Sequence, residues 1–477
     1  MRLLWRRKHQ SYRRNMNSNN QSPSRSCCFE LALNDAIPKT NMMILSNFYL
    51  VYFIILINIC FLMLFPCIVH GDILDPFSRF IEKKIQTDNI PGVAVAIVEG
   101  NHVVYIKGFG YRDIEAKLPV NSETLFHIGS NTKSMTALMV AALVDEEKAD
   151  WDTPIIQYYA DFALEDSIAA KQVTFRHLLS MRAGIPADAE NDLLEDDLAK
   201  DIFSIIENAE ILGYPGEVFE YSNLSSTAAG YIAAIIAGNC LDNVYEGYIQ
   251  LLKEKILYPA GMRNACVRVS EAQKNDNYGK SYMINNGVLE VAISEDFDGD
   301  PLAPSGSLKA SVSEMALYLS TLLNRGVAPD GNRVISSENL NETWITYLEN
   351  YGMGFEKKTY KDIEIFGHEG SFDNYLSVFG ISIELNMGYI ILTNCEDASE
   401  GLIADAPEFL VDLYLSEKET SKGDIDGSQS IDLKDVILAL QICLNKSSFV
   451  NLDADINLDK RIGIAEAIYD FQVISER

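Results

Sequence analysis

The sequence predicts an α+β fold in which an antiparallel β-sheet is flanked by helices and carries a mainly helical inserted region, followed by a small all-α module. Three observations lead to this prediction. Strand-like runs lie near both ends of the large central part of the chain, and the residues between them combine helical periodicity with Gly/Pro breaks. The last fifty or so residues repeat an acidic loop followed by a helical pattern.

The N-terminal residues divide into a basic and an apolar segment. We expect residues 1–46 to be a basic cytoplasmic tail, or an extension upstream of a true start at Met42 or Met43. Within residues 47–71, Phe48 to Val69 is an uncharged run of 22 residues, long enough to cross a bilayer as a helix. It predicts a transmembrane anchor or a signal peptide, since Val69-His70-Gly71 resembles a cleavage site. A buried soluble helix is the alternative.

The basic flank also predicts orientation. By the positive-inside rule it stays in the cytoplasm and everything after His70 is exported, so we expect a periplasmic or extracellular protein, anchored in the inner membrane through residues 48–69 if the run is uncleaved. The formal net charge of -29 argues against nucleic-acid binding, because a phosphate backbone repels such a surface. Four later cysteines are too sparse for a disulfide scaffold and have no zinc-site spacing.

Residues 73–415 form the predicted large domain. Its expected elements are, in order, a helix over Asp75–Lys84, strands over Val93–Val98 and Val103–Lys107, a mainly helical stretch from Ser130 to about Met262, strands over Asn374–Ile383 and Gly388–Asn394, and a helix over Leu402–Leu415. Strands from both chain ends therefore share one sheet. Residues 416–422 are predicted to be a polar linker to a module over 423–477.

The first candidate for chemistry is Ser130, with Lys133 three residues later and therefore on the same helix face. A lysine held against a serine hydroxyl can remove its proton if burial lowers the pKa of the amine, and a helix N-terminus favours a developing oxyanion. Taken alone, the pair is more often an ordinary helix-capping serine with a solvent-facing lysine.

Two further motifs follow. Tyr221 and Asn223 come just after a Pro-Gly break, where a loop can present side chains to a cleft. A phenol beside a cationic lysine can lose its proton below its usual pKa of about 10 and act as a base, while an amide can bind a carbonyl. The third motif, Gly367 to Ser371, precedes the late strands and contains His368 and Gly370. Each motif alone is more often structural than catalytic.

The three motifs together, in this order, resemble the active-site set of serine β-lactamases and penicillin-binding proteins. The Tyr-x-Asn and His-x-Gly variants look like the branch of class C β-lactamases, D-alanyl-D-alanine carboxypeptidases and esterases. The resemblance covers roughly Asp75 to Leu415 and includes the segments Ile90–Ala96, Gly108–Gly110, Leu125–Ser130, Val173–Ser180, Pro304–Leu308 and Tyr351–Phe355.

This resemblance implies a β-lactamase/transpeptidase-like fold and acyl transfer without a cofactor. Ser130 would attack a carbonyl, Lys133 and Tyr221 would relay its proton, and Asn223 would hold a small-molecule or peptide substrate. The backbone N–H groups of Ser130 and Ser371 would form the oxyanion hole.

His368 stands where many relatives have a lysine that helps to bind a substrate carboxylate. This difference favours an esterase or peptidase-like hydrolase over a specialised β-lactamase. A catalytically silent penicillin-binding-like protein and a scaffold-docked binding component are the alternatives to an active enzyme.

The C-terminal module carries two loops with oxygen side chains at the spacing of a calcium loop. The predicted ligands are Asp424, Asp426, Ser428, Asp432 and Asp435 in the first loop, and Asp455, Asn457, Asp459 and Glu466 in the second. The loop-helix repeat looks like a type I dockerin, which implies calcium and a cohesin-like partner. Gln429 and Lys460 replace the usual glycine, and an acidic helical tail without calcium is the alternative.

Overall fold

The computed structural model describes residues 71–194, 197–294, 296–428, 431–444, 451–457 and 460–476. The predicted membrane or signal segment over 48–69 and the predicted ligand Asp459 lie outside these ranges. Within them, no helix is by itself long and apolar enough to cross a membrane.

The centre of the large domain is a seven-stranded sheet in the order β3-β2-β1-β11-β10-β9-β8. The strands are β1 (Gly92–Glu99), β2 (His102–Asp113), β3 (Leu118–Pro119), β8 (Glu356–Tyr360), β9 (Ile363–Phe372), β10 (Tyr375–Ser382) and β11 (Met387–Thr393). All neighbours are antiparallel, and Val93 of β1 pairs with Thr393 of β11. The predicted α+β fold, with strands from both chain ends in one antiparallel sheet, is confirmed.

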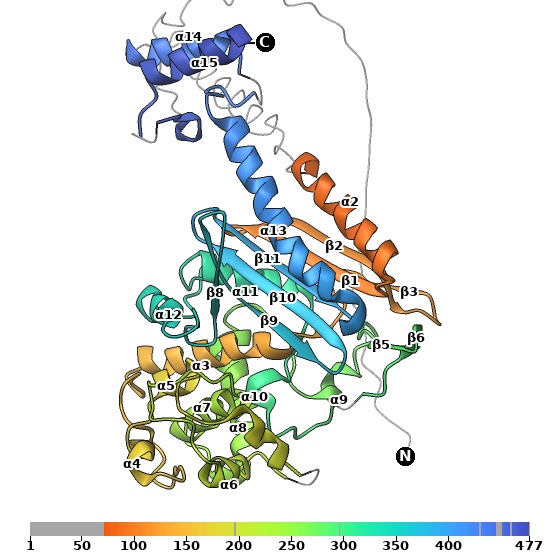
Figure 1. The fold of residues 1–477 in the computed structure, drawn as a ribbon, viewed down its shortest axis with the longest axis vertical. Helices are drawn as coiled ribbons and strands as arrows, with labels where there is room; N and C mark the ends of the chain where they lie inside the picture. The colour runs from red at the N-terminus through yellow and green to blue at the C-terminus, as the bar shows by residue number, and fades with distance from the viewer. Residues whose placement is uncertain are drawn as a thin grey trace, which may run out of the picture. The chain divides into compact units, whose positions relative to one another are not determined.

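Both faces of the sheet are covered by helices. Along β1, Val93, Val95 and Ile97 enter one apolar core and the alternating alanines another, as the period of two along a strand requires. Helices α2 (Gly71–Asp88) and α13 (Glu396–Ser421) lie side by side across the first face (Figure 1). Helix α11 (Val312–Leu323) covers the second face.

The inserted region between β3 and β8 is mainly helical and forms one end of the domain (Figure 1). Its helices are α3 (Thr132–Asp145), α4 (Ser167–Ala170), α5 (Phe175–Leu179), α6 (Ile202–Asn208), α7 (Asn223–Ile236), α8 (Val244–Leu252), α9 (Val269–Ala272), α10 (Ala303–Gly306), α11 and α12 (Ser337–Trp344). Two short pairs of strands interrupt it, β4 (Phe126–His127) with β7 (Lys309–Ala310), and β5 (Tyr282–Asn285) with β6 (Val288–Val291).

Two local expectations differ from the structure. The motif Gly367 to Ser371 was expected before the late strands, but it lies inside β9, whose pairing partner β10 the sequence did predict. The polar segment 416–422 was expected to be a linker, but α13 continues to Ser421. Glutamate and lysine favour a helix, and no glycine or proline interrupts this stretch before Gly423.

The C-terminal module consists of α14 (Leu433–Cys443), a short 3-10 turn at Leu452–Ala454 and α15 (Ile464–Glu476). Its core is small, and its members are Ile425, Val436, Ala439, Ala454, Ile462 and Ala467. The two loop segments are joined by a hydrogen bond from Gly423 N to Ala454 O (3.1 Å) and another from Asn451 Nδ2 to Asp424 O (3.1 Å).

Candidate active site

Ser130 lies in a 3-10 turn over Gly129–Asn131 that leads directly into α3. The turn is fixed to the sheet, because Asn131 Nδ2 donates to Ser377 Oγ (2.8 Å), and Ser377 Oγ donates in turn to Ile128 O (3.0 Å). The Ser130 side chain is thereby held at the junction of the helical region and β9.

Lys133 is one helical turn further along and is completely buried. Its Nζ donates to Ser130 Oγ (2.9 Å), to Asn223 Oδ1 (2.7 Å) and to Ser305 O (2.9 Å). Burial lowers the pKa of Lys133 to about 7, although the Glu190 carboxylate acts in the opposite direction. Near neutral pH, half of the amine is therefore free to accept a proton from Ser130.

Tyr221 comes from the loop that precedes α7 and shares a side-chain hydrogen bond with Ser130. Its ring centroid lies 4.9 Å from Lys133 Nζ. The expectation that a neighbouring cation lowers the pKa of this phenol is not met. Burial raises the pKa of Tyr221 well above its usual value, and the hydrogen bond with Ser130 offsets this only in part. The structure thus presents Tyr221 as a protonated phenol.

Asn223 begins α7 and is held by a residue that the sequence did not single out. Its Nδ2 donates to Glu190 Oε2 (2.9 Å) while its Oδ1 accepts from Lys133. Glu190 comes from a 3-10 segment over Ala187–Asp192, 33 residues earlier, with no motif around it. Only the fold brings this carboxylate to the lysine.

The third predicted motif forms the opposite wall. A Cβ atom at Gly370 would lie 2.1 Å from Ile128 O, and one at Gly129, where φ is +51°, would lie 2.7 Å from Ser371 N. Glycine at both positions is therefore what lets β9 approach the backbone around Ser130. The segments that carry the N–H groups of Ser130 and Ser371 are consequently adjacent.

His368 is 3% exposed, and its ring centroid lies 6.0 Å from that of Tyr221. Its Nε2 shares a hydrogen bond of 2.9 Å with Tyr351 Oη, and its Nδ1 contacts Glu369 O. Burial, with the charge of Lys133 acting in the same direction, lowers the pKa of His368 to about 3. The ring is therefore neutral. Its partner Tyr351 begins a segment that contributed to the resemblance, but the sequence assigned this residue no role in the site.

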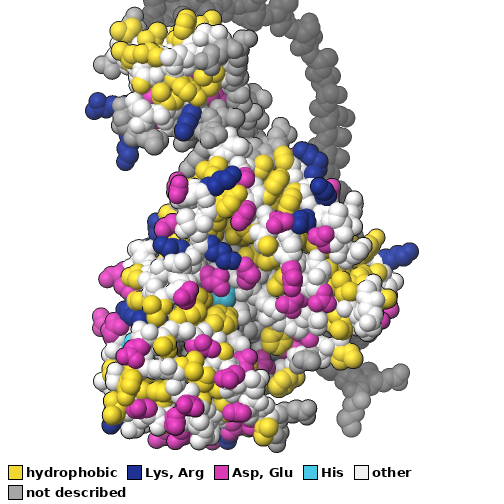
Figure 2. Space-filling view, in the orientation of Figure 1, with side chains coloured by type: hydrophobic (Ala, Val, Ile, Leu, Met, Phe, Trp, Pro, Cys, Tyr) yellow, Lys and Arg dark blue, Asp and Glu magenta, His cyan; other side chains and the backbone are white. Residues whose placement is uncertain are grey.

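A cavity of about 450 Å³ adjoins these residues and is rich in acid. It is bordered by Tyr221, His368, Gly370 and Ser371, and also by Glu356, Glu369, Glu396 and Glu400. Figure 2 shows acidic side chains distributed over the visible face of the molecule. Lys358 is ion-paired with Glu356 (3.8 Å) and with Glu369. The cavity wall is thus predominantly negative.

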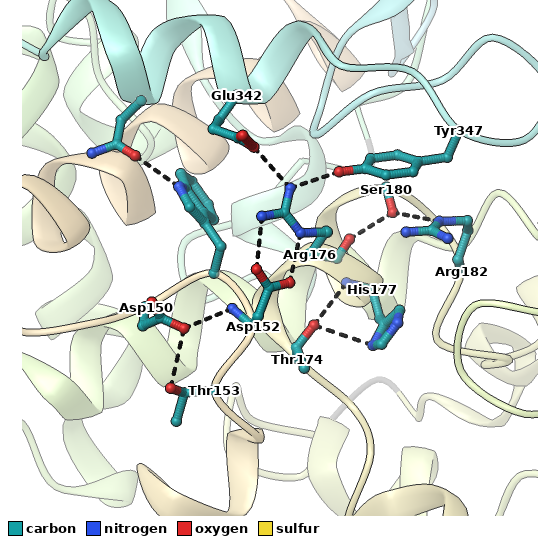
Figure 3. A network of polar contacts seen from close by, with 12 residues as sticks. Asp150, Asp152, Thr153, Thr174, Arg176, His177, Ser180, Arg182, Glu342 and Tyr347 are labelled. Atoms are coloured by element: carbon teal, nitrogen blue, oxygen red, sulfur yellow. Dashed lines mark hydrogen bonds and ion pairs between the residues drawn. The ribbon is translucent and has the colours of Figure 1, made fainter.

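A polar network surrounds Arg176 and includes Asp152, Glu342 and Tyr347 (Figure 3). Arg176 binds both carboxylate oxygens of Asp152 (2.7 and 2.9 Å), and its Nη1 donates to Glu342 (2.9 Å) and Tyr347 Oη (2.6 Å). The Arg182 guanidinium lies 4.0 Å from the Tyr347 ring centroid. The intervening Met181 O accepts from Glu220 N (2.9 Å), directly before Tyr221, so the network fixes the start of the Tyr221 loop.

A buried ion pair lies on the other side of the serine. Asp296 accepts from His127 Nε2 (3.1 Å) and pairs with Lys309 Nζ (2.5 Å), and all three side chains are inaccessible. Burial, together with the charge of Lys309, lowers the pKa of His127 to about 4, so its ring is neutral. The ring stacks on Phe372 at 4.2 Å, next to Ser371. No sequence motif indicated this cluster.

The predicted calcium ligands of the first loop converge. Carboxylate oxygens of Asp424, Asp426 and Asp435 lie within 4.8 Å of one another. Ser428 N donates to Asp424 Oδ1 (2.9 Å), and Asp432 caps α14 by accepting from Lys434 N (2.6 Å).

In the second loop, backbone N–H groups donate hydrogen bonds to two of the predicted ligand side chains. Asp455 Oδ1 accepts from Asn457 N (3.2 Å), and Glu466 Oε2 accepts from Gly463 N (2.6 Å). Glu466 is 1% exposed.

A profile of the Beta-lactamase family matches residues 77–410. Among curated proteins, the Unguisins hydrolase ungD' of Aspergillus campestris is 26% identical over 346 residues, which are 68% of this chain and 62% of that protein. The chain thus spans less than two thirds of that relative's length.

Two solved structures are similar as well. The octameric penicillin-binding protein homologue from Pyrococcus abyssi is 26% identical with a TM-score of 0.62, over 72% of this chain and 77% of that one. The D-amino acid amidase from Ochrobactrum anthropi SV3 is 22% identical with a TM-score of 0.56, over 70% of this chain and 98% of that one, a likeness of fold.

Proposed function

The chain belongs to the Beta-lactamase family, and from this premise we propose that it is an exported serine hydrolase that works through an acyl-enzyme on Ser130. The observation that carries the proposal is the contact of 2.9 Å between Lys133 Nζ and Ser130 Oγ at a fully buried amine. Such an amine is a base strong enough to activate a hydroxyl, and a large fraction of it is neutral near pH 7.

The proposed reaction has two halves. Ser130 Oγ bonds to the substrate carbonyl carbon while its proton passes to Lys133 Nζ, and the N–H groups of Ser130 and Ser371 stabilise the oxyanion. The carbonyl then re-forms as the bond to the leaving group breaks, and the protonated Tyr221 delivers a proton to that group and is reprotonated from Lys133. Water attacks the resulting ester by the same route in reverse, which releases the acid and restores Ser130.

The proposed substrates are esters or D-amino-acid peptides, with β-lactam amides as the less favoured class. A neutral, buried His368 offers little attraction to a substrate carboxylate, and the cavity glutamates, of which Lys358 pairs with Glu356 and Glu369, disfavour one as well. Penicillins carry such a carboxylate. Substrates that are neutral near the scissile bond are therefore favoured.

The test is intact-protein mass spectrometry of the exported part after exposure to a fluorophosphonate and, separately, to a penicillin. Native protein should gain one fluorophosphonate adduct, Ser130→Ala none, and Ser167→Ala, an exposed serine of α4, should react like native protein. A lasting penicillin adduct would indicate a penicillin-binding or esterase site. Failure of the native protein to react with either reagent would establish the silent, penicillin-binding-like alternative.

We also propose that the C-terminal module is dockerin-like and binds calcium. Its convergent carboxylates are the hard oxygen ligands that calcium prefers, so the residues fit the ion. Asp424, Asp426 and Asp435 would hold it in the first loop, with Ser428 and Asp432 beside them. When bound, the ion would neutralise carboxylates that the fold buries, and chelation with EGTA should remove amide protection from residues 431–476 without affecting Ser130.

A cohesin-like partner is the proposed ligand of the module. Support comes from apolar side chains that are exposed at helical spacing. They are Leu433, Ile437 and Leu440 on α14, Leu444 directly after it, and Ile464, Ile468 and Phe471 on α15. Immobilised type I cohesin should retain the native chain but not the variant Ile437→Asp/Leu440→Asp. Equal retention of both would exclude this face as the contact.

Export itself is tested by N-terminal sequencing of the secreted or membrane-bound protein. A start near Gly71 would identify residues 48–69 as a cleaved signal, and an intact run in the membrane fraction would identify an anchor. Recovery of the whole chain from the cytoplasm would contradict the proposed export.

A further inference from the structure

The C-terminal module buries more carboxylates than its two predicted calcium loops require. Asp424, Asp435, Asp455, Glu466 and Asp470 are each at most 4% exposed. The first four occupy predicted ligand positions. Asp470 belongs to neither loop, since it lies on α15, one helical turn after Glu466. A carboxylate in this position is costly to bury, so its surroundings indicate what it does.

Asp470 is 0% exposed, and neither of its side-chain oxygens has a hydrogen-bond partner among the described residues. Burial, and after it the charges of Asp435, Glu466 and Asp424, raise the pKa of Asp470 to about 7. Its Oδ1 is packed against the backbone at the start of the first loop, because a Cβ atom at Gly423, where φ is +85°, would lie 2.2 Å from it. The Asp470 side chain is therefore directed from the second helix toward the first loop.

No described lysine or arginine is ion-paired with Asp470 or Glu466, and Glu466 Oε1 is likewise buried without a partner. An unpaired buried charge of this kind normally costs several kcal/mol. The group that would offset it must be positive, small and able to accept several oxygen ligands at once, and calcium has these properties.

The two loop-helix units of the module can be compared at the position of Asp470. The position four residues after the last carboxylate of the loop is Ala439 in the first unit and Asp470 in the second. Ala439 is buried in the apolar core of the module. The second unit therefore departs from the first at a position whose side chain is directed toward the other unit's loop.

The carboxylates within ligand distance of one another are those of Asp424, Asp426 and Asp435, and Asp470 lies outside this set. We propose that Asp470, from outside both loops, stabilises a calcium ion held by these three residues through its negative charge. The ion would then attract carboxylates from both halves of the module and would tie α15 to the first loop. This inference rests on the calcium binding proposed above. It predicts that Asp470 weakens the calcium-free module and strengthens the calcium-bound one.

The experiment is calorimetric titration of the full chain with calcium chloride, together with thermal unfolding in calcium and in EGTA. Native protein is compared with Asp470→Asn, which keeps the shape, and with Asp470→Ala, which reproduces the residue of the first unit. Asp405→Asn, an exposed acid of α13, controls for the loss of one negative charge. We expect calcium affinity to fall about 10- to 100-fold in both Asp470 variants and to stay native in the control.

The unfolding measurement separates the explanations. If Asp470 stabilises the bound ion, both variants unfold at a higher temperature than native protein in EGTA, and calcium raises their unfolding temperature less. If affinity and the calcium-dependent shift are native in both variants, Asp470 is merely a buried acid and the inference is overturned, although calcium binding stands. If native protein itself takes up no calcium, the calcium proposal and this inference fall together.

Discussion

The large domain and the C-terminal module differ in the partners that they provide for buried charged side chains. Lys133 is completely buried, and its amine has three oxygen partners from three separate segments. Asp296 is inaccessible as well, and Lys309 provides its counter-charge. Asp470 is equally buried, yet neither oxygen has a partner among the described residues.

This difference indicates whether each region can provide the partners of its buried charges from its own residues. In the large domain, Lys133 and the Asp296–Lys309 pair obtain their partners from the protein, so burial changes the chemistry of the group, as the lowered pKa of Lys133 shows. In the module the proposed partner is a calcium ion, so we expect the fold of the module to depend on that ion. The following predictions test the two halves of this comparison.

The largest effect is expected for Lys133→Met, which fills the same space without an amine. Because Ser130 loses its base, turnover of a chromogenic ester should fall roughly 10²- to 10⁴-fold while the protein stays folded. Steady-state kinetics with far-UV circular dichroism check this, and Lys148→Met, an exposed lysine, is the control. Near-native turnover in Lys133→Met would remove the lysine from the mechanism.

Next in size is the buried pair of Asp296 and Lys309. Asp296→Asn leaves Lys309 as an uncompensated buried cation and should lower the free energy of unfolding by about 3–5 kcal/mol. Adding Lys309→Met should restore most of this loss, because no charge then remains. Urea unfolding of the two single variants and the double variant provides the measurement, and an additive double variant would show that the pair is not coupled.

A smaller effect is expected from pH. Lys133 must be neutral to accept a proton, and its pKa is lowered to about 7. The value of kcat/KM should therefore fall tenfold per unit below pH 7 and level off above it. A profile that rises only near pH 10 would mean that the amine keeps the ordinary pKa of a lysine.

The smallest effect is expected for Tyr351→Phe, which removes the hydrogen bond to His368 Nε2. One neutral hydrogen bond contributes about 1 kcal/mol, so KM should rise several-fold with kcat nearly unchanged. Kinetics on a neutral ester check the expectation. A loss of kcat alone would instead place Tyr351 among the groups that act in the chemical step.

Local spacing explains which parts of the site the sequence could indicate. Ser130 and Lys133 are one helical turn apart, so their contact needs nothing but the helix. Glu190 and the Asp296–Lys309 pair carry no motif, and Tyr351 had no predicted role. All of them reach the site only because distant segments pack together. The same limit applies to β9, where the sequence provided the motif but not the strand.

The sequence by itself determined the antiparallel sheet built from both chain ends, the helical insertion, and the family to which residues 77–410 belong. Alternating and helical periodicities encode those features locally. Only the tertiary structure decided the protonation of the side chains. Tyr221 was expected to have a lowered pKa beside a cation, and burial raises it instead. Desolvation depends on everything packed around a group, and no spacing along the chain records that.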